Sequence, residues 1–90
     1  MAKYRKKPVV VEAWQAYDDF DLDDKLPVWV NNAFIDRIIG ETYQSIYKYY
    51  VNTLEGNMYF KNGDYLIKGV RGELYAVKAD IFEETYEEVK

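Results

Sequence analysis

Residues 46–77 read IYKYYVNTLEGNMYFKNGDYLIKGVRGELYAV, and this stretch decides the fold. Aromatic and β-branched residues fill its runs, and the runs are separated by Glu55-Gly56, Asn62-Gly63 and Arg71-Gly72. Aromatic and β-branched side chains suit a pleated, half-buried strand, whereas Gly and Asn favour tight turns. The stretch therefore predicts an antiparallel β-meander.

The two later turns fix the expected pairing of the strands. Asn62-Gly63 predicts a type I′ hairpin, because both residues tolerate a positive φ. If the Arg71-Gly72 turn is two residues long, Lys68 pairs with Tyr75 and both lie on a mixed, partly polar face. The opposite face then carries the expected core residues Tyr65, Ile67, Leu74 and Ala76.

The first half of the chain predicts one strand and one helix. The β-branched run in residues 9–16 is typical of a mostly buried strand. After an acidic loop at residues 18–24, Pro27 fits a first helical turn. Apolar residues then recur at helical spacing: Leu26, Trp29, Val30, Ala33 and Phe34. Residues 36–39 fit either the end of this helix or the start of a strand.

These elements predict one α+β domain over residues 1–90, with residues 1–7 as a basic arm. The expected order is a strand, one main helix, then a strongly bent antiparallel meander that forms a small, open, barrel-like sheet. Asp80 is expected to cap a short C-terminal helical turn. The core is expected around Trp14, Trp29 and Phe34.

Composition excludes several classes of function. The chain has neither Cys nor His, which removes disulfides, redox chemistry and the usual general base. A net charge of −4 disfavours nonspecific nucleic-acid binding, and no apolar run approaches the roughly 20 residues of a membrane span. We therefore expect a cytoplasmic protein without a cofactor.

Acidic residues suggest two kinds of site, and in both cases a structural role for the acids is favoured. Asp19, Asp21 and Asp23 follow a calcium-loop spacing, but Asp24 and Val30 stand where that loop needs Gly and a bidentate Glu. A hydrolase would use a carboxylate pair, for example Asp64 with Glu73 or Asp80. Turn and cap positions explain these acids as well, so we expect no metal and no catalytic residue.

Basic and aromatic residues suggest a binding site and an interface. Lys68, Arg71, Tyr75 and Lys78 lie on or around one predicted hairpin, where cations beside an aromatic ring suit a small anionic nucleotide. The alternative is that the two lysines are ordinary solvated strand residues. The Tyr-rich strand predicts a homo-oligomer with Tyr47, Tyr49 or Tyr50 at or near the contact.

The chain resembles a family of short phage and prophage accessory proteins. Their shared pattern reads approximately TLEG, then GDYIIKGVKGEFYPxKPDIFxxTYE, and matches here at residues 53–56, 63–73, 75, 78, 80–82 and 85–87. Residues 6–13 and 27–30 are similar to that family too. The chain departs from it at Asn62 and Ala79, where the family often has Pro. The resemblance implies an accessory protein in a bacterial host cytoplasm, and it supplies no catalytic residues.

The leading functional hypothesis is therefore a non-catalytic phage accessory protein that binds and sequesters, or blocks, a host factor. Its concrete version is an anti-defence protein that holds a nucleotide-type immune signal. The alternatives are a structural or assembly component of the phage particle and a small carboxylate-dependent hydrolase. No specific binding of nucleic acid is expected.

Overall fold

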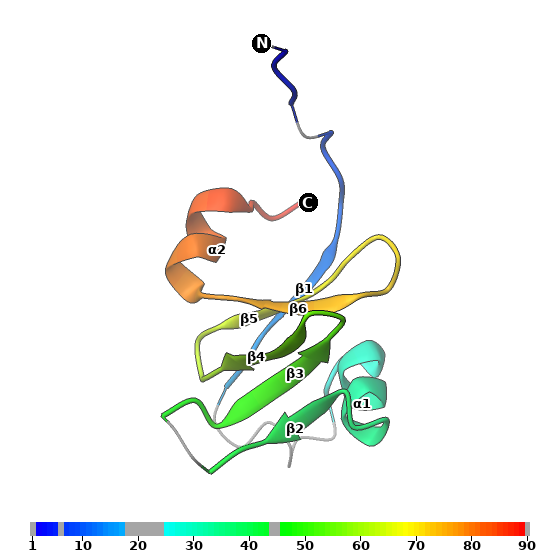
Figure 1. The fold of residues 1–90 in the computed structure, drawn as a ribbon, viewed down its shortest axis with the longest axis vertical. Coiled ribbons are helices and arrows are strands. Elements are labelled where there is room, and N and C mark those ends of the chain that lie inside the picture. Colours follow the sequence, from blue (N-terminus) through cyan, green and yellow to red (C-terminus); the bar gives the residue numbers. More distant parts are fainter. Residues whose placement is uncertain (1, 6, 18–24, 44–45, 90) are drawn as a thin grey trace.

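The fold is shown by a computed structural model, which describes residues 2–5, 7–17, 25–43 and 46–89. The predicted acidic loop at residues 18–24 lies outside these ranges. The described residues form six strands and two helices, in this chain order (Figure 1): β1 (Glu12–Gln15), α1 (Val28–Ile35), β2 (Ile39–Glu41), β3 (Tyr49–Thr53), β4 (Gly56–Phe60), β5 (Tyr65–Lys68), β6 (Leu74–Val77) and α2 (Ala79–Thr85). The α+β class is confirmed.

The strands form two antiparallel sheets of three strands each. Sheet A has the order β1-β5-β6, and sheet B has the order β2-β3-β4. In Figure 1, α1 lies beside sheet B, whereas α2 lies over sheet A near the C-terminus. The two sheets are not closed into a barrel. Strand β1 pairs with β5, which is far from it in the sequence.

The turn at Asn62-Gly63 is the reason that the strands divide into two sheets. The N–H of Asp64 donates to the carbonyl of Lys61 at 3.0 Å, and only Gly63, with φ 92°, has a positive φ in this turn. This pattern is that of a type II turn, which splays the flanking strands instead of pairing them. The predicted type I′ hairpin is therefore wrong, and β4 and β5 diverge.

Gly63→Ala is expected to lower the free energy of unfolding by about 1–2 kcal/mol, because a side chain is strained at this φ. A Cβ at position 63 would meet no atom within 4 Å, so the cost is one of backbone strain alone. Urea denaturation measures it, with Asn62→Ala as the control at the neighbouring position. An unchanged midpoint for Gly63→Ala would contradict this assignment of the turn.

The loop between β5 and β6 is one residue longer than predicted. The N–H of Gly69 donates to Glu73 at 2.8 Å, and Gly72 has a φ of 82° after a turn closed by Gly69. A three-residue loop of this kind shifts the register by one residue. Lys68 therefore pairs with Leu74, and Tyr75 pairs with Ile67. Leu74 and Ala76 of β6 face the core as predicted, but Tyr65 and Ile67 of β5 lie on the opposite face of sheet A, so the predicted core face of β5 is wrong.

The core lies between the inner face of sheet A, sheet B and α1. Its largest fully buried side chains are Phe60, Ile39, Leu66, Val30 and Val51. Trp14 is buried as predicted, but Trp29 and Phe34 are only half-buried at the edge of the core. The reason is that α1 inserts its smaller residues, Val30 and Ala33, toward the sheets. The chain turns after α1, and the ambiguous segment becomes strand at Ile39.

Candidate functional site

The outer face of sheet A carries a stack of three aromatic rings. The ring of Phe82 on α2 lies on Tyr65 of β5, with centroids 3.7 Å apart and planes 8° apart. Tyr86 continues the stack, with its centroid 4.9 Å from that of Phe82. The Tyr86 hydroxyl lies 3.3 Å from that of Tyr75 on β6. These aromatic contacts attach α2 to sheet A, although no residue of α2 is itself fully buried.

Asp64 fixes the position at which α2 begins. Its side chain is 5% exposed. One carboxylate oxygen accepts the N–H of Lys61 at 3.1 Å, and the other accepts that of Ala79, the first residue of α2, at 3.4 Å. Asp80 was expected to cap this helix, but it lies inside the first turn and accepts the N–H of the next residue. Asp64 therefore takes the role of a helix-capping side chain, although it lies 15 residues before Ala79 in the sequence.

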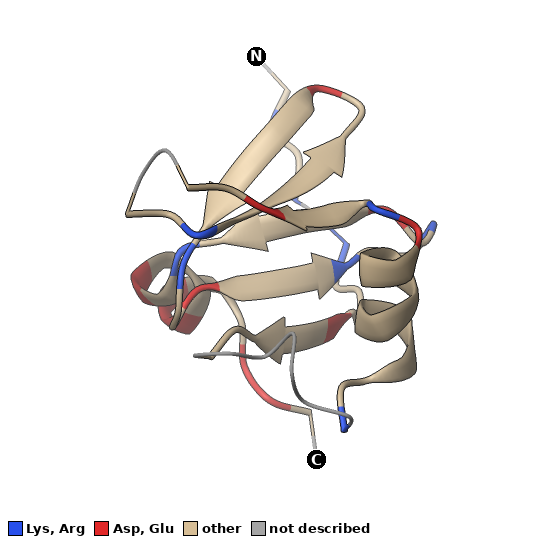
Figure 2. Ribbon diagram, turned by 90° about the horizontal axis from the view of Figure 1, so that it is seen from below, with Lys and Arg blue, Asp and Glu red and all other residues tan. Residues whose placement is uncertain are grey.

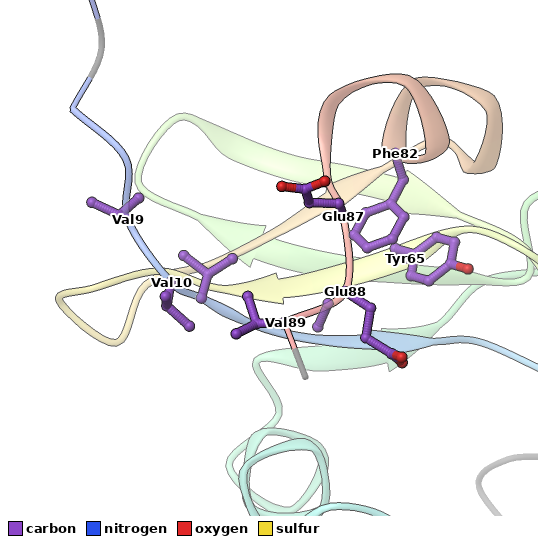
Figure 3. Close-up of a pocket in the computed structure, with 9 residues that line it drawn as sticks. Val9, Val10, Tyr65, Phe82, Glu87, Glu88 and Val89 are labelled. Atoms are coloured by element: carbon purple, nitrogen blue, oxygen red, sulfur yellow. The ribbon is translucent and has the colours of Figure 1, made fainter.

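A pocket of about 500 Å³ opens beside the aromatic stack, between the N-terminal segment and the C-terminal tail (Figure 3). Its walls combine aliphatic, aromatic and acidic side chains: Val9, Val10, Val11, Ala13, Tyr65, Phe82, Glu87, Glu88 and Val89. Several of the valines are well exposed, with Val10 at 74% and Val89 at 71%. Within the described lining, Glu87 and Glu88 are the only charged side chains, so aliphatic and aromatic side chains are combined with a negative charge.

The two glutamates at the rim do not form a catalytic pair. Figure 3 shows the carboxylates of Glu87 and Glu88 pointing in opposite directions from the extended tail. Paired-carboxylate hydrolysis needs both groups to face one substrate bond. The arrangement instead suits electrostatic attraction of a cation to the rim, above an apolar floor.

The contact between Tyr75 and Tyr86 predicts a dependence of stability on alkaline pH. Burial, then the hydrogen bond to Tyr86, raises the pKa of Tyr75 from 10.0 to about 12. The stabilisation from the neutral phenol is therefore complete below pH 10 and is lost as pH rises from about 10 to about 12. Tyr75→Phe should show a shallower loss of stability than the wild type in this window. Equal slopes in urea denaturation across these pH values would contradict the prediction.

The four residues suggested as a nucleotide site do not converge. Lys68 lies on the inner face of sheet A, where its amino group is 3.7 Å from the carboxylate of Glu12, while Tyr75 lies on the outer face. Arg71 lies in the loop before β6 and Lys78 follows β6. These two cations therefore lie beyond opposite ends of β6. A two-residue turn would place Lys68 and Tyr75 on one face, whereas the three-residue loop places them on opposite faces.

The acids suggested for hydrolysis are also separated or occupied. Asp64 and Glu73 lie at opposite ends of β5, and Asp64 directs both oxygens to backbone N–H groups. Glu73 accepts the N–H of Arg71 within its own loop. Among the described residues, no group of three or more acids is placed to hold a metal ion. The suggested calcium ligands lie in the segment that the structure does not describe.

The three tyrosines suggested for an interface have different environments. Tyr49 is 4% exposed and stacks on Phe60 in the core, so a partner cannot reach it. It is buried because the side chains of odd-numbered residues of β3 point into the core. The ring of Tyr47 lies 5.7 Å from the Lys61 amino group. Tyr50 lies over Gly40 on the outer face of sheet B, edge-on to Tyr59.

The pocket itself was missed by sequence reasoning. The valines at 9–11 predict a buried strand, but β1 begins only at Glu12 and the valines before it line the pocket. Glu87 and Glu88 belong to a run of acids whose sequence pattern alone does not point to a site. Residues 9–11 and 87–89 line one pocket although they are distant in sequence, and no local pattern indicates this arrangement.

Neither helix in the described part of the chain has the length and apolar character needed to cross a bilayer. Comparison with protein-family models, with curated proteins and with solved structures finds no match to this chain.

Proposed function

We propose that this chain is a non-catalytic accessory protein of phage origin that binds and blocks a host protein. The phage setting rests on the motif resemblance, above all the GDYLIKGVRGE segment at residues 63–73. The binding role rests on one observation, the acidic-rimmed apolar pocket beside the aromatic stack. Its residues come from both ends of the chain and from sheet A.

The chemistry of the pocket defines the ligand class. Apolar side chains cover its floor, and burial of an aliphatic group there would contribute about 25 cal/mol for each Å² removed from water. Glu87 and Glu88 would attract a positive charge and repel a phosphate. The best-fitting ligand is therefore a host-protein segment that carries an aliphatic side chain next to Lys or Arg.

The nucleotide version of the hypothesis has weaker support. It needs Lys68, Arg71, Tyr75 and Lys78 on one surface, whereas they lie on two faces and at two ends of β6. A nucleotide in the pocket would place its phosphates beside two carboxylates. A host protein with a basic and apolar segment fits the same surface without this repulsion.

The test measures binding of short labelled peptides by fluorescence polarisation. One peptide set places Leu or Val beside Lys or Arg, and a matched set replaces each cation with Glu. The E87Q/E88Q double variant should weaken the basic peptides by about fivefold, since each exposed charge contributes modestly. The E83Q/E84Q variant changes the net charge equally on α2, outside the pocket, and should leave binding unchanged.

Two further measurements separate the alternatives. Binding of the basic peptides should weaken as salt rises, because exposed charges are screened. Linear and cyclic nucleotides are incubated with the protein and analysed after denaturation. Tight nucleotide binding with unchanged recovery would replace the pocket proposal with the sequestration hypothesis. Turnover of any nucleotide beyond one equivalent would overturn a non-catalytic role.

A further inference from the structure

Strand β4 forms an open, unprotected edge of sheet B. Four of its five residues are exposed, and only Phe60 is buried. Natural proteins usually protect such an edge with Pro, a charge or a bulge. The segment Gly56–Phe60 reads GNMYF and contains neither Pro nor a charge. Figure 2 shows the strands mostly tan, with Lys, Arg, Asp and Glu gathered near the strand ends and in the loops and helices.

The hydrogen bonds of β3 determine which groups of β4 are unpaired. The N–H of Asn52 donates to Ile38, and the carbonyl of Lys48 accepts from Thr42, each at 2.7 Å. Even-numbered residues of β3 therefore point their backbone N–H and C=O groups toward β2. Odd-numbered residues of β3 therefore point their backbone N–H and C=O groups toward β4. Their partners there are Gly56, Met58 and Phe60.

Asn57 and Tyr59 consequently point their N–H and C=O groups outward, because these directions alternate along a strand. Within the described ranges, no backbone hydrogen bond reaches either residue from that side. Each residue therefore offers one donor and one acceptor to a further strand. The other edge of sheet B is shorter, since β2 has only three residues.

We propose that β4 pairs with β4 of a second copy of this chain, antiparallel and centred on Met58, to join the two B sheets into one. In this register Asn57 exchanges hydrogen bonds with Tyr59 of the second copy, and Tyr59 with its Asn57. All four outward-facing groups of each strand are then paired. The two Met58 residues lie directly opposite each other.

Charge complementarity selects this register over its neighbours. Glu55 precedes β4 and Lys61 follows it, and both are exposed. Centring on Met58 places Glu55 opposite Lys61 of the second copy, and this pair occurs twice. A centre at Asn57 or Tyr59 also satisfies the alternation, but neither brings opposite charges together. Among the described residues, no ion pair links Glu55 or Lys61 within one chain.

Apolar surface on the same strand adds to the contact. Met58 is 38% exposed and Leu54, in the turn before β4, is completely exposed. Both line a groove of about 580 Å³ that also includes Ile38 and Leu74. Pairing at β4 covers the Met58 side of this groove with the second Met58. The acidic-rimmed pocket belongs to the other sheet, so this proposal stands apart from the proposed function.

Sedimentation equilibrium over a concentration series tests the assembly and its charges. The wild type should reach twice the 10.7 kDa of one chain. Glu55→Lys and Lys61→Glu should each raise the dimer dissociation constant by about tenfold, since each removes two cross-strand pairs and adds repulsion. The E55K/K61E double variant should restore dimerisation, because it exchanges the charges. Circular dichroism verifies that all variants are folded.

Cross-linking tests the register. The chain has no cysteine, so Met58→Cys introduces a single thiol. Its Cα would lie about 4.5 Å from its equivalent, within the range for a disulfide. Met58→Cys should form a covalent dimer on mild oxidation. Asn57→Cys is the control, since that pair would lie roughly 8–9 Å apart by strand spacing and rise.

The outcomes are decisive in both directions. A monomer mass at the highest concentration would overturn the proposal. So would a dimer that the double charge exchange fails to restore, or one in which Asn57→Cys cross-links as fast as Met58→Cys. Restoration together with selective cross-linking at position 58 would support it.

Discussion

Asp64→Ala is expected to lower the free energy of unfolding by about 2–4 kcal/mol, which is a large part of the stability of a small domain. The carboxylate is buried and accepts backbone N–H groups from Lys61 and Ala79. Its removal leaves both donors without this partner and loosens the start of α2 from the β4–β5 turn. A charged acceptor makes stronger hydrogen bonds than a neutral one, which places the effect above that of an ordinary exposed acid.

Asp80→Ala is the matched control for this prediction. Asp80 is also an acid that accepts one backbone N–H near the start of α2, but it is exposed. Its replacement should cost about 0.5 kcal/mol through the weakened helix start. Urea denaturation with both variants gives the comparison. Equal effects of the two substitutions would show that Asp64 does not anchor α2.

The sequence predicted the elements better than their partners. The strands, the helix after Pro27 and the short C-terminal helix follow from local spacing and turn residues, and all are present. The pairing failed at two turns, where one φ angle and one extra loop residue decide the outcome. Asn62 accepts either sign of φ, so the dipeptide alone does not distinguish a type I′ turn from a type II turn.

The site depended on these same turns. A shift of one residue in the pairing register exchanges the faces of one strand relative to its partner. Lys68 and Tyr75, predicted to share a face, therefore lie on opposite faces of sheet A. The pocket also needed knowledge that residues 9–11 and 87–89, which are distant in sequence, line one cavity.

Phe82→Ala is expected to cost about 2–3 kcal/mol and to free α2 from sheet A. Truncation of a buried Phe usually costs about 3–5 kcal/mol, and the value here is lower because Phe82 is only half-buried. The ring stacks on both Tyr65 and Tyr86, so its loss removes two aromatic contacts. No residue of α2 is fully buried, so apart from the Asp64 contact at its start the helix depends mainly on this stack.

The loss of this ring should affect dynamics and binding together. Amide hydrogen exchange in α2 should accelerate more than exchange in β3, whose residues are held by sheet B and the core. Basic peptides should also lose affinity, because Phe82 lines the pocket. Phe82→Leu keeps an apolar side chain and should recover most of the stability, while Ile81→Ala on the same helix leaves the stack intact. If hydrogen exchange in α2 were unchanged in Phe82→Ala, the aromatic stack would not be what attaches this helix to the sheet.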